Sequence, residues 1–343
     1  KARTLRGIAP DQYDTPWRSF AHLLDERARL TPDQTYLIYY DDKTGVRSEY
    51  SYVAFNRRLN QAANYLRDVL GVKRGDCVAT LAFNHPDTML IFFACWKIGA
   101  VATPQNASED DVRIAFILRN GECRVLLAMP EYFARAQSIL PNADCLKQVV
   151  VIDAAYQIAL NNQSDHFIPP ADNMLEDAAM LVYTSGTTGA PKGLMLSQYN
   201  LFADCEAMAE WQGMTAASRM MCILPVHHMN GINVTHVLPM LVGSGVVLNR
   251  GFKASNFWQR MAAERVHIVS VVPTILQFLC EANEDVSDLD LSNCKHFICG
   301  AGTLAVSLVT RFEDRFGIKV MHGYGLSETT SFSCFTPLDL SPE

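Results

Sequence analysis

The sequence reads Tyr-Thr-Ser-Gly-Thr-Thr-Gly-Ala-Pro-Lys-Gly over residues 183–193, between the apolar runs 180–182 and 194–196. Short apolar runs on both sides of a glycine-rich loop are typical of a strand, a loop and a second strand. Gly186 and Gly189 lack a Cβ atom, so the backbone can turn sharply and bring its N–H groups close to an anion. Hydroxyl side chains add hydrogen-bond donors, and Lys192 adds a compact positive charge. The composition and order of the loop therefore predict phosphate binding.

This loop differs from a Walker A loop on both sides of its lysine. A Walker A loop continues through Gly-Lys-Ser/Thr into a helix. Here Pro191 precedes Lys192 and Gly193 comes directly after it, so no helix is expected to begin there. The alternative is a polar hairpin loop that binds no ligand. The combination of glycines, hydroxyls and lysine favours the phosphate-binding interpretation.

The loop closely resembles the signature loop of the adenylate-forming superfamily, which includes acyl-CoA synthetases, luciferases and the adenylation domains of peptide synthetases. The resemblance implies the N-terminal AMP-binding core of these enzymes. That core is an α/β fold in which two mostly parallel sheets and their helices form α-β-α-β-α layers. The resemblance assigns ATP binding to Thr184, Ser185, Gly186, Thr187, Thr188, Gly189 and Lys192. Lys192 is also expected to act in catalysis.

The rest of the chain alternates expected strands and helices, which favours parallel sheets covered on both faces. We expect one core over residues 1–343, with a first sheet unit over 72–215 and a second formed by 15–70 and 216–338. Within these units, helices are expected from Ser51 through Leu70 and from about Val234 to Val242. The polar segment 153–172 is expected to be a surface connection.

A second candidate site is Pro-Val-His-His-Met-Asn-Gly over residues 225–231. No acidic residue is spaced as a third ligand to the two histidines, which argues against zinc. Taken alone, they are two ordinary loop histidines. The superfamily carries Pro-x-aromatic-His-x-x-Gly here, and the resemblance places His228 beside the incoming carboxylate, where it is expected to be catalytic. His227 stands where many members have an aromatic residue.

A third glycine-rich turn, Gly-Ala-Gly-Thr-Leu-Ala over residues 300–305, also fits a dinucleotide-binding fingerprint. That fingerprint needs an acidic residue at the end of the next strand, which here ends at His322 and Gly323. A nicotinamide-dependent oxidoreductase is therefore a weak alternative. In the superfamily a similar turn borders adenine, and the resemblance assigns nucleotide binding to Gly300, Ala301, Gly302 and His322.

The fourth element, Gly-Tyr-Gly-Leu-Ser-Glu-Thr over residues 323–329, closely matches the Tyr-Gly-x-Thr/Ser-Glu segment of the superfamily. Tyr324 offers a flat ring for adenine, and Ser327 can donate to the α-phosphate. Glu328 is expected to be catalytic as an oxygen ligand of Mg²⁺, with Thr184 near the same ion. The residues expected to contact the nucleotide in this element are Gly323, Tyr324, Gly325, Leu326 and Ser327.

The resemblance implies ATP-dependent activation of a carboxylic acid to an acyl-adenylate, followed by transfer to a thiol, with coenzyme A expected. Loading of a carrier protein and a non-catalytic nucleotide-binding module remain as alternatives. The superfamily's Thr-Gly-Asp-type segment and its mobile C-terminal domain, which carries a second catalytic lysine, are not found in this sequence. The resemblance therefore covers nearly all of this chain but about the first two-thirds of a full-length enzyme.

Composition limits the partners and the cellular compartment that we expect for this chain. The net charge of −7 and the lack of a basic stripe argue against nucleic acid as a partner. Ten cysteines without a Cys-x-x-Cys pair indicate buried thiols in a reducing cytoplasm. The apolar run near 89–96 is too short to span a bilayer. The sequence leaves open the identity of the acid and the oligomeric state, with a homodimer as one option.

Overall fold

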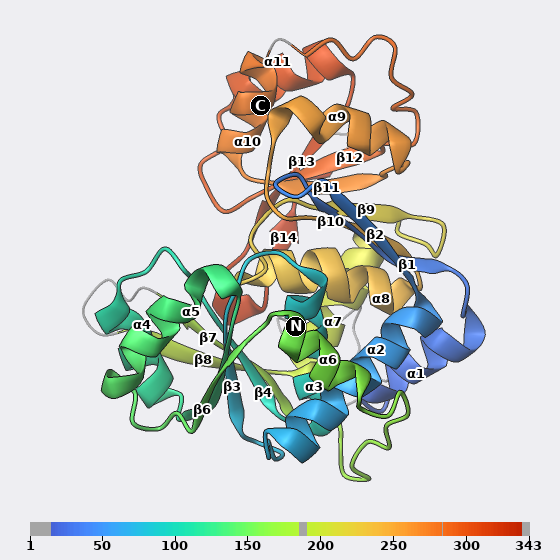
Figure 1. Cartoon of the computed structure of the whole chain (residues 1–343). Coiled ribbons are helices and arrows are strands. Elements are labelled where there is room, and N and C mark those ends of the chain that lie inside the picture. Colours follow the sequence, from blue (N-terminus) through green and yellow to red (C-terminus); the bar gives the residue numbers. More distant parts are fainter. Residues whose placement is uncertain (1–14, 185–190, 283, 338–343) are drawn as a thin grey trace, which may run out of the picture.

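The computed structural model describes residues 15–184, 191–282 and 284–337, which contain two β-sheets (Figure 1). The six-stranded sheet has the order β6-β5-β3-β4-β7-β8 and is parallel except for the antiparallel pair β7 and β8. Its strands are β3 (Cys77–Leu81), β4 (Val101–Gln105), β5 (Cys123–Ala128), β6 (Gln148–Val151), β7 (Ala178–Thr184) and β8 (Lys192–Ser197).

The eight-stranded sheet has the order β14-β13-β12-β11-β9-β10-β1-β2 and is antiparallel only at its two edge pairs. Both sheets are thus mostly parallel, as expected. The strands are β1 (Thr35–Asp41), β2 (Val46–Ser51), β9 (Arg219–Cys222), β10 (Gly245–Asn249), β11 (Ile268–Val271), β12 (His296–Cys299), β13 (Lys319–Tyr324) and β14 (Cys334–Phe335).

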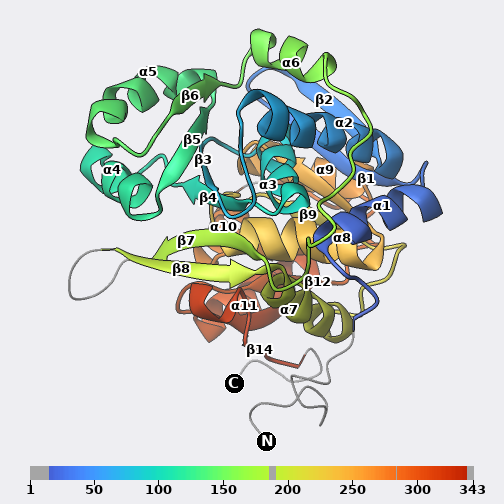
Figure 2. The same ribbon diagram turned by 90° about the horizontal axis from the view of Figure 1, so that it is seen from below.

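Helices form three layers around these sheets, which confirms the expected α-β-α-β-α arrangement. Figure 2 shows α4 and α5 on the side of the six-stranded sheet that faces away from α3. Figure 1 shows α9, α10 and α11 on the far side of the eight-stranded sheet. The outer helices are α4 (Asp111–Asn120), α5 (Pro130–Ile139), η3 (Leu140–Asn142), α9 (Ala254–Ala263), α10 (Pro273–Glu281) and α11 (Val306–Phe316).

The central layer packs against both sheets in one hydrophobic cluster. It comprises α1 (Phe20–Leu30), α2 (Tyr52–Asn64), the π-helix η2 (Tyr65–Val69), α3 (Pro86–Ile98), α7 (Gln198–Trp211), the π-helix η4 (Asn230–Val237) and α8 (Leu238–Val242). The remaining described helices are α6 (Ala154–Asn161) and the 3₁₀ helix η5 (Ser327–Thr329).

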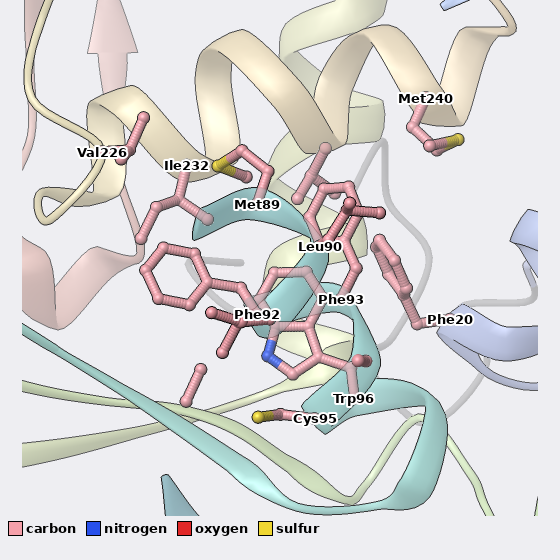
Figure 3. Close-up of a cluster of buried hydrophobic side chains, with 14 of the residues drawn as sticks. Phe20, Met89, Leu90, Phe92, Phe93, Cys95, Trp96, Val226, Ile232 and Met240 are labelled. Atoms are coloured by element: carbon pink, nitrogen blue, oxygen red, sulfur yellow. The ribbon is translucent and has the colours of Figure 1, made fainter. Parts of the chain in front are cut away.

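Every residue of α3 is buried, because this helix is apolar on all sides and lies between the two sheets. The ring of Trp96 lies 4.6 Å from that of Phe20, and its Nε1 donates to the carbonyl oxygen of Ala179 in β7 at 2.7 Å. Figure 3 shows Val226 and Ile232 in the same cluster. The core thus fixes one strand of the 183–193 hairpin and the base of the histidine loop together.

Three sequence expectations need correction. Residues 154–161 form helix α6 rather than a plain surface connection, because Tyr156 and Leu160 bury one face and Asp153 caps the first turn. The helix expected through Leu70 is α-helical only to Asn64 and continues as a π turn. The helix expected from Val234 begins at Asn230 as a π-helix, a form that hydrophobic periodicity does not reveal.

Among the described residues, no helix is both long and apolar enough to cross a membrane.

Candidate active site

A cavity of about 480 Å³ opens between the two sheets, on the side where several parallel strands end. Most of its lining comes from four segments that are far apart in the sequence. These are residues within 104–117, 182–183, 224–230 and 325–332. Three of the four overlap or adjoin motifs identified in the sequence, so the fold brings these motifs to one hollow.

The 183–193 motif includes the end of β7 and the start of β8, which pair in antiparallel fashion, so the two expected strands are confirmed. Thr184 pairs with Lys192, and Tyr183 pairs with Gly193. A Cβ atom on Gly193 would lie 3.1 Å from the ring of Tyr183, so glycine lets this ring pack across the hairpin. Tyr183 lines the cavity, and its hydroxyl donates to Asn120 at 2.7 Å.

The hairpin tip was expected to bind phosphate. Its residues Ser185, Gly186, Thr187, Thr188 and Gly189 lie outside the described part of the chain. Thr184, at the end of β7, is half-buried. Lys192, at the start of β8, is exposed, so its ammonium group is accessible to a ligand. Neither residue lines the cavity itself, but Thr184 comes directly after Tyr183, which does.

His227 and His228 both line the cavity, with ring centroids 4.3 Å apart. Desolvation lowers the pKa of His227 to about 3, and the neighbouring His228 adds a smaller lowering effect. Desolvation also lowers the pKa of His228, while the Glu109 carboxylate acts in the opposite direction. Both imidazoles are therefore neutral at pH 7, and His228 can offer a hydrogen bond rather than a fixed charge.

The backbone of the histidine loop is held by Asn84, which is buried after the end of β3. Its Nδ2 donates to the carbonyl oxygens of Leu224 and Asn249, at 2.9 and 3.0 Å. Its Oδ1 accepts from the backbone N–H of Val226 at 2.8 Å. One amide from the six-stranded sheet thereby fixes the entry to the loop and the end of β10.

Sequence reasoning missed a fourth wall of the cavity, which lies beyond the end of β4. Glu109 and Arg113 lie on it and form an ion pair, with 3.0 Å between Arg113 Nε and a Glu109 carboxylate oxygen. Residues just beyond the carboxyl ends of parallel strands are where ligands bind in such sheets. The position of Glu109 a few residues after the end of β4 is the signal that could have drawn attention to it.

The two remaining glycine turns pack directly against each other. A Cβ atom on Gly300 would lie 2.8 Å from the carbonyl oxygen of Gly323 and 2.7 Å from the ring of Phe332. A Cβ atom on Gly323 would lie 2.5 Å from the same ring. Gly300 therefore requires glycine because it faces a backbone atom, whereas a Cβ atom on Gly323 would force aromatic rings to move. Ala301, which lies between Gly300 and Gly302, has φ +61° and lines the cavity.

The 323–329 motif contributes Gly325, Leu326 and Ser327 to the cavity wall. Tyr324 and Glu328 are exposed beside it and do not line the cavity. Four further residues with expected roles also lie outside the lining: His322, Gly300, Gly302 and Gly323. Of the expected site residues, His228, Ala301, Gly325, Leu326 and Ser327 form part of the cavity wall.

A magnesium ion would have to be held by few protein ligands. Among the described residues, no group of three or more His, Cys, Asp or Glu side chains is placed to hold a metal ion. Glu328 is an exposed carboxylate, and Ser327 beside it lines the cavity. Mg²⁺ prefers one or two carboxylates completed by phosphate oxygens and water, so this arrangement fits the ion if it arrives with a nucleotide.

Comparisons with known proteins identify relatives of this chain. Similar curated proteins include a sulfoacetate–CoA ligase from Cupriavidus necator, 29% identical over 96% of this chain and 63% of that protein. A feruloyl-CoA synthase from an Amycolatopsis species is 30% identical over 81% of this chain and 54% of that protein. The chain thus spans about three-fifths of the length of the curated relatives it matches.

Solved structures share the fold. The N-terminal domain of FACL13 from Mycobacterium tuberculosis superposes with a TM-score of 0.85 at 24% identity, over 94% of this chain and 79% of that one. The anthranilate CoA ligase AuaEII, in complex with anthranoyl-AMP, gives a TM-score of 0.87 at 24% identity, over 96% and 63%. The family model described as "AMP-binding enzyme" matches residues 24–343. The chain therefore belongs to the AMP-binding family of adenylate-forming enzymes.

Proposed function

We propose that the full-length protein activates a carboxylic acid with ATP and then transfers the acyl group to a thiol, which we take to be coenzyme A. The observation that carries the proposal is the shared cavity. Tyr183, His228 and Ser327, from three separate motifs, line one hollow in a member of the AMP-binding family. Relatives named for joining sulfoacetate, oxalate or carnitine to coenzyme A support this choice of reaction.

In the first step, a carboxylate oxygen of the acid attacks the α-phosphorus of ATP. The new bond joins that oxygen to phosphorus, and the bond from phosphorus to the bridging oxygen breaks. Pyrophosphate leaves with the electron pair, and an acyl-adenylate remains. In the second step, the thiolate of coenzyme A attacks the acyl carbon, its proton having passed to solvent, and AMP leaves.

Residues of the four motifs take distinct parts in this proposal. His228, neutral at pH 7, orients the acid by a hydrogen bond. Lys192 and the hairpin tip bind the β- and γ-phosphates, while Tyr324 and the turn at Gly300 border the adenine. Positioning of this kind accounts for most of the rate gain, because the protein contributes no covalent intermediate.

Magnesium would be held by Glu328, with the Thr184 hydroxyl nearby. When bound, the ion supplies positive charge that offsets the negative charge developing on the phosphates.

Exchange of labelled pyrophosphate into ATP tests the first step with a panel of aliphatic, aromatic and dianionic acids. We expect label in ATP that depends on both magnesium and one class of acid. Absence of exchange with every acid in a broad panel would refute the proposal. The acceptor is then identified by offering coenzyme A and a phosphopantetheinyl carrier protein in parallel, since transfer to the carrier alone would replace coenzyme A in the second step.

A further inference from the structure

Asp204 lies on α7 where three parts of the candidate site meet. Its Oδ2 accepts a hydrogen bond from Asn233 Nδ2 at 2.8 Å and another from the hydroxyl of Ser331. The backbone N–H of Phe332 donates to the same carboxylate. Ser331 is 127 residues away in the sequence and Asn233 is 29 residues away, so these contacts join distant segments.

Each partner belongs to a segment that carries one of the motifs. Asn233 is on η4, which begins two residues after His228. Ser331 and Phe332 come shortly after the 323–329 motif and line the cavity. Helix α7 itself continues from β8, and the Ser197 side chain caps its first turn. Asp204 therefore connects the helix after the hairpin to both other motif segments.

The segment bound by Asp204 is tightly packed and strained. A Cβ atom on Gly325 would lie only 1.7 Å from the carbonyl oxygen of Ser331, so this oxygen approaches the Gly325 backbone closely. Thr330, just before Ser331, has φ +73°, in a region that a β-branched residue rarely adopts. The backbone at Ser331 therefore packs directly against Gly325, which forms part of the cavity wall.

The carboxylate has no charge partner among the side chains described. Its hydrogen-bond donors are a hydroxyl, an amide and a backbone N–H, all neutral. Burial raises the pKa of Asp204 to about 7, and the three hydrogen bonds offset only part of that effect. A half-buried carboxylate without a cation contributes little net stability. The hydrogen bonds of Asp204 are therefore better explained if this residue fixes the positions of the segments that it contacts.

We propose that Asp204 is a positioning residue, which holds the 325–332 turn against η4 in the geometry that formation of the acyl-adenylate requires. The consequence for activity rests on the proposed function. The consequence for the turn does not, because the hydrogen bonds exist whatever the reaction is.

The test compares Asp204→Leu, Asp204→Asn and a matched control, Asp314→Leu, which changes an exposed aspartate on α11. Leucine removes both acceptor oxygens. Asparagine can keep one oxygen at the position that now accepts from Asn233 and Ser331. Three quantities are measured on the full-length protein: deuterium uptake of a peptide covering 323–333, the midpoint of thermal unfolding, and the rate of pyrophosphate exchange.

For Asp204→Leu we expect faster deuterium uptake in 323–333 and at least a ~10-fold slower exchange, since misplacement of about 1 Å can cost ~100-fold. The unfolding midpoint should fall by a few degrees, because three hydrogen-bond donors lose their acceptor. Asp204→Asn should restore uptake and most of the rate, and Asp314→Leu should change none of the three quantities.

Wild-type uptake in Asp204→Leu would overturn the inference, whatever the activity. If the wild-type protein exchanges no label with any acid, the proposed function fails, while the uptake measurement still decides the role of Asp204. If Asp204→Leu does not fold, Ser331→Ala removes one donor to the carboxylate and should raise uptake in the same peptide. Unchanged uptake in Ser331→Ala would then count against the inference.

Discussion

Replacement of Gly325 by alanine should inactivate the protein through one steric conflict. The added Cβ atom would lie 1.7 Å from the carbonyl oxygen of Ser331 and 2.7 Å from the Cα atom of Phe332. Ordinary contacts of a Cβ atom begin near 3.4 Å, so the oxygen of Ser331 must retreat by the difference, about 1.7 Å. Because the obstacles are backbone atoms, no side-chain rotation can relieve the conflict.

A shift of this size has two expected consequences. Ser331 would lose its position against Asp204, and the wall formed by Gly325 and Leu326 would move relative to His228. Since misplacement by about 1 Å can cost ~100-fold in rate, we expect pyrophosphate exchange to fall by ~100-fold or more. Overpacking of this kind also destabilises by about 1–3 kcal/mol, so the midpoint of denaturant unfolding should decrease.

The control is Gly251→Ala, because a Cβ atom at Gly251 would have no neighbour within 4 Å. Both variants are assayed for exchange at saturating ATP and for unfolding in urea. Gly251→Ala should match the wild-type protein in both assays. Wild-type exchange by Gly325→Ala would refute the reasoning, since it would mean that the 325–331 turn relaxes without affecting the site.

Three single side chains give further predictions. Trp96→Ala should lower the free energy of unfolding by about 3–5 kcal/mol, because it opens a cavity in the central layer. It also leaves the Ala179 carbonyl oxygen without the donor Trp96 Nε1. A urea titration measures the loss. Glu328→Ala should abolish the magnesium dependence of exchange and reduce its rate by at least ~10-fold, and wild-type turnover would remove Glu328 from the mechanism. Asp204 has a folded pKa of about 7, above an ordinary value of about 4, so between these values the folded state binds more protons than the unfolded state. The free energy of unfolding of the wild-type protein, relative to that of Asp204→Asn, should therefore be greatest below pH 4. It should fall by ~1–2 kcal/mol as the pH rises from 4 through 7, after allowance for partial exposure of the carboxylate. If the difference between the two proteins stays constant from pH 4 to pH 8, the assignment is contradicted.

The sequence was most informative where local rules decide the structure. The β7–β8 hairpin results from two apolar runs around a glycine-rich loop, and the alternation of strands and helices indicates parallel sheets. Helix α6 was missed because a polar composition hid Tyr156 and Leu160, which are spaced to share one buried face. The π-helix η4 could not be predicted, since its hydrogen-bond pattern has no distinct hydrophobic period.

The candidate site also contains some residues that the sequence predicts and others that it does not. Tyr183, His228 and Ser327 belong to motifs that can be recognised in the sequence, and the fold places them at one cavity. Glu109 and Asp204 lie in segments without a motif. Their importance comes from partners that only the tertiary structure supplies, namely His228 for Glu109 and Ser331 for Asp204. No local pattern encodes a contact across 127 residues.

The motifs supply chemical groups, but their relative positions depend on polar residues outside the motifs. Asn84 fixes the entry to the histidine loop through Leu224 and Val226, and Asp204 fixes the turn that comes after the 323–329 motif. The apolar core around Trp96 sets the sheets at a given spacing, yet apolar packing is non-directional and cannot by itself set the orientation of a loop backbone. Hydrogen bonds from side chains with defined geometry supply that orientation. A protein that kept all the motifs but lost Asn84 and Asp204 would therefore be expected to fold and yet adenylate poorly.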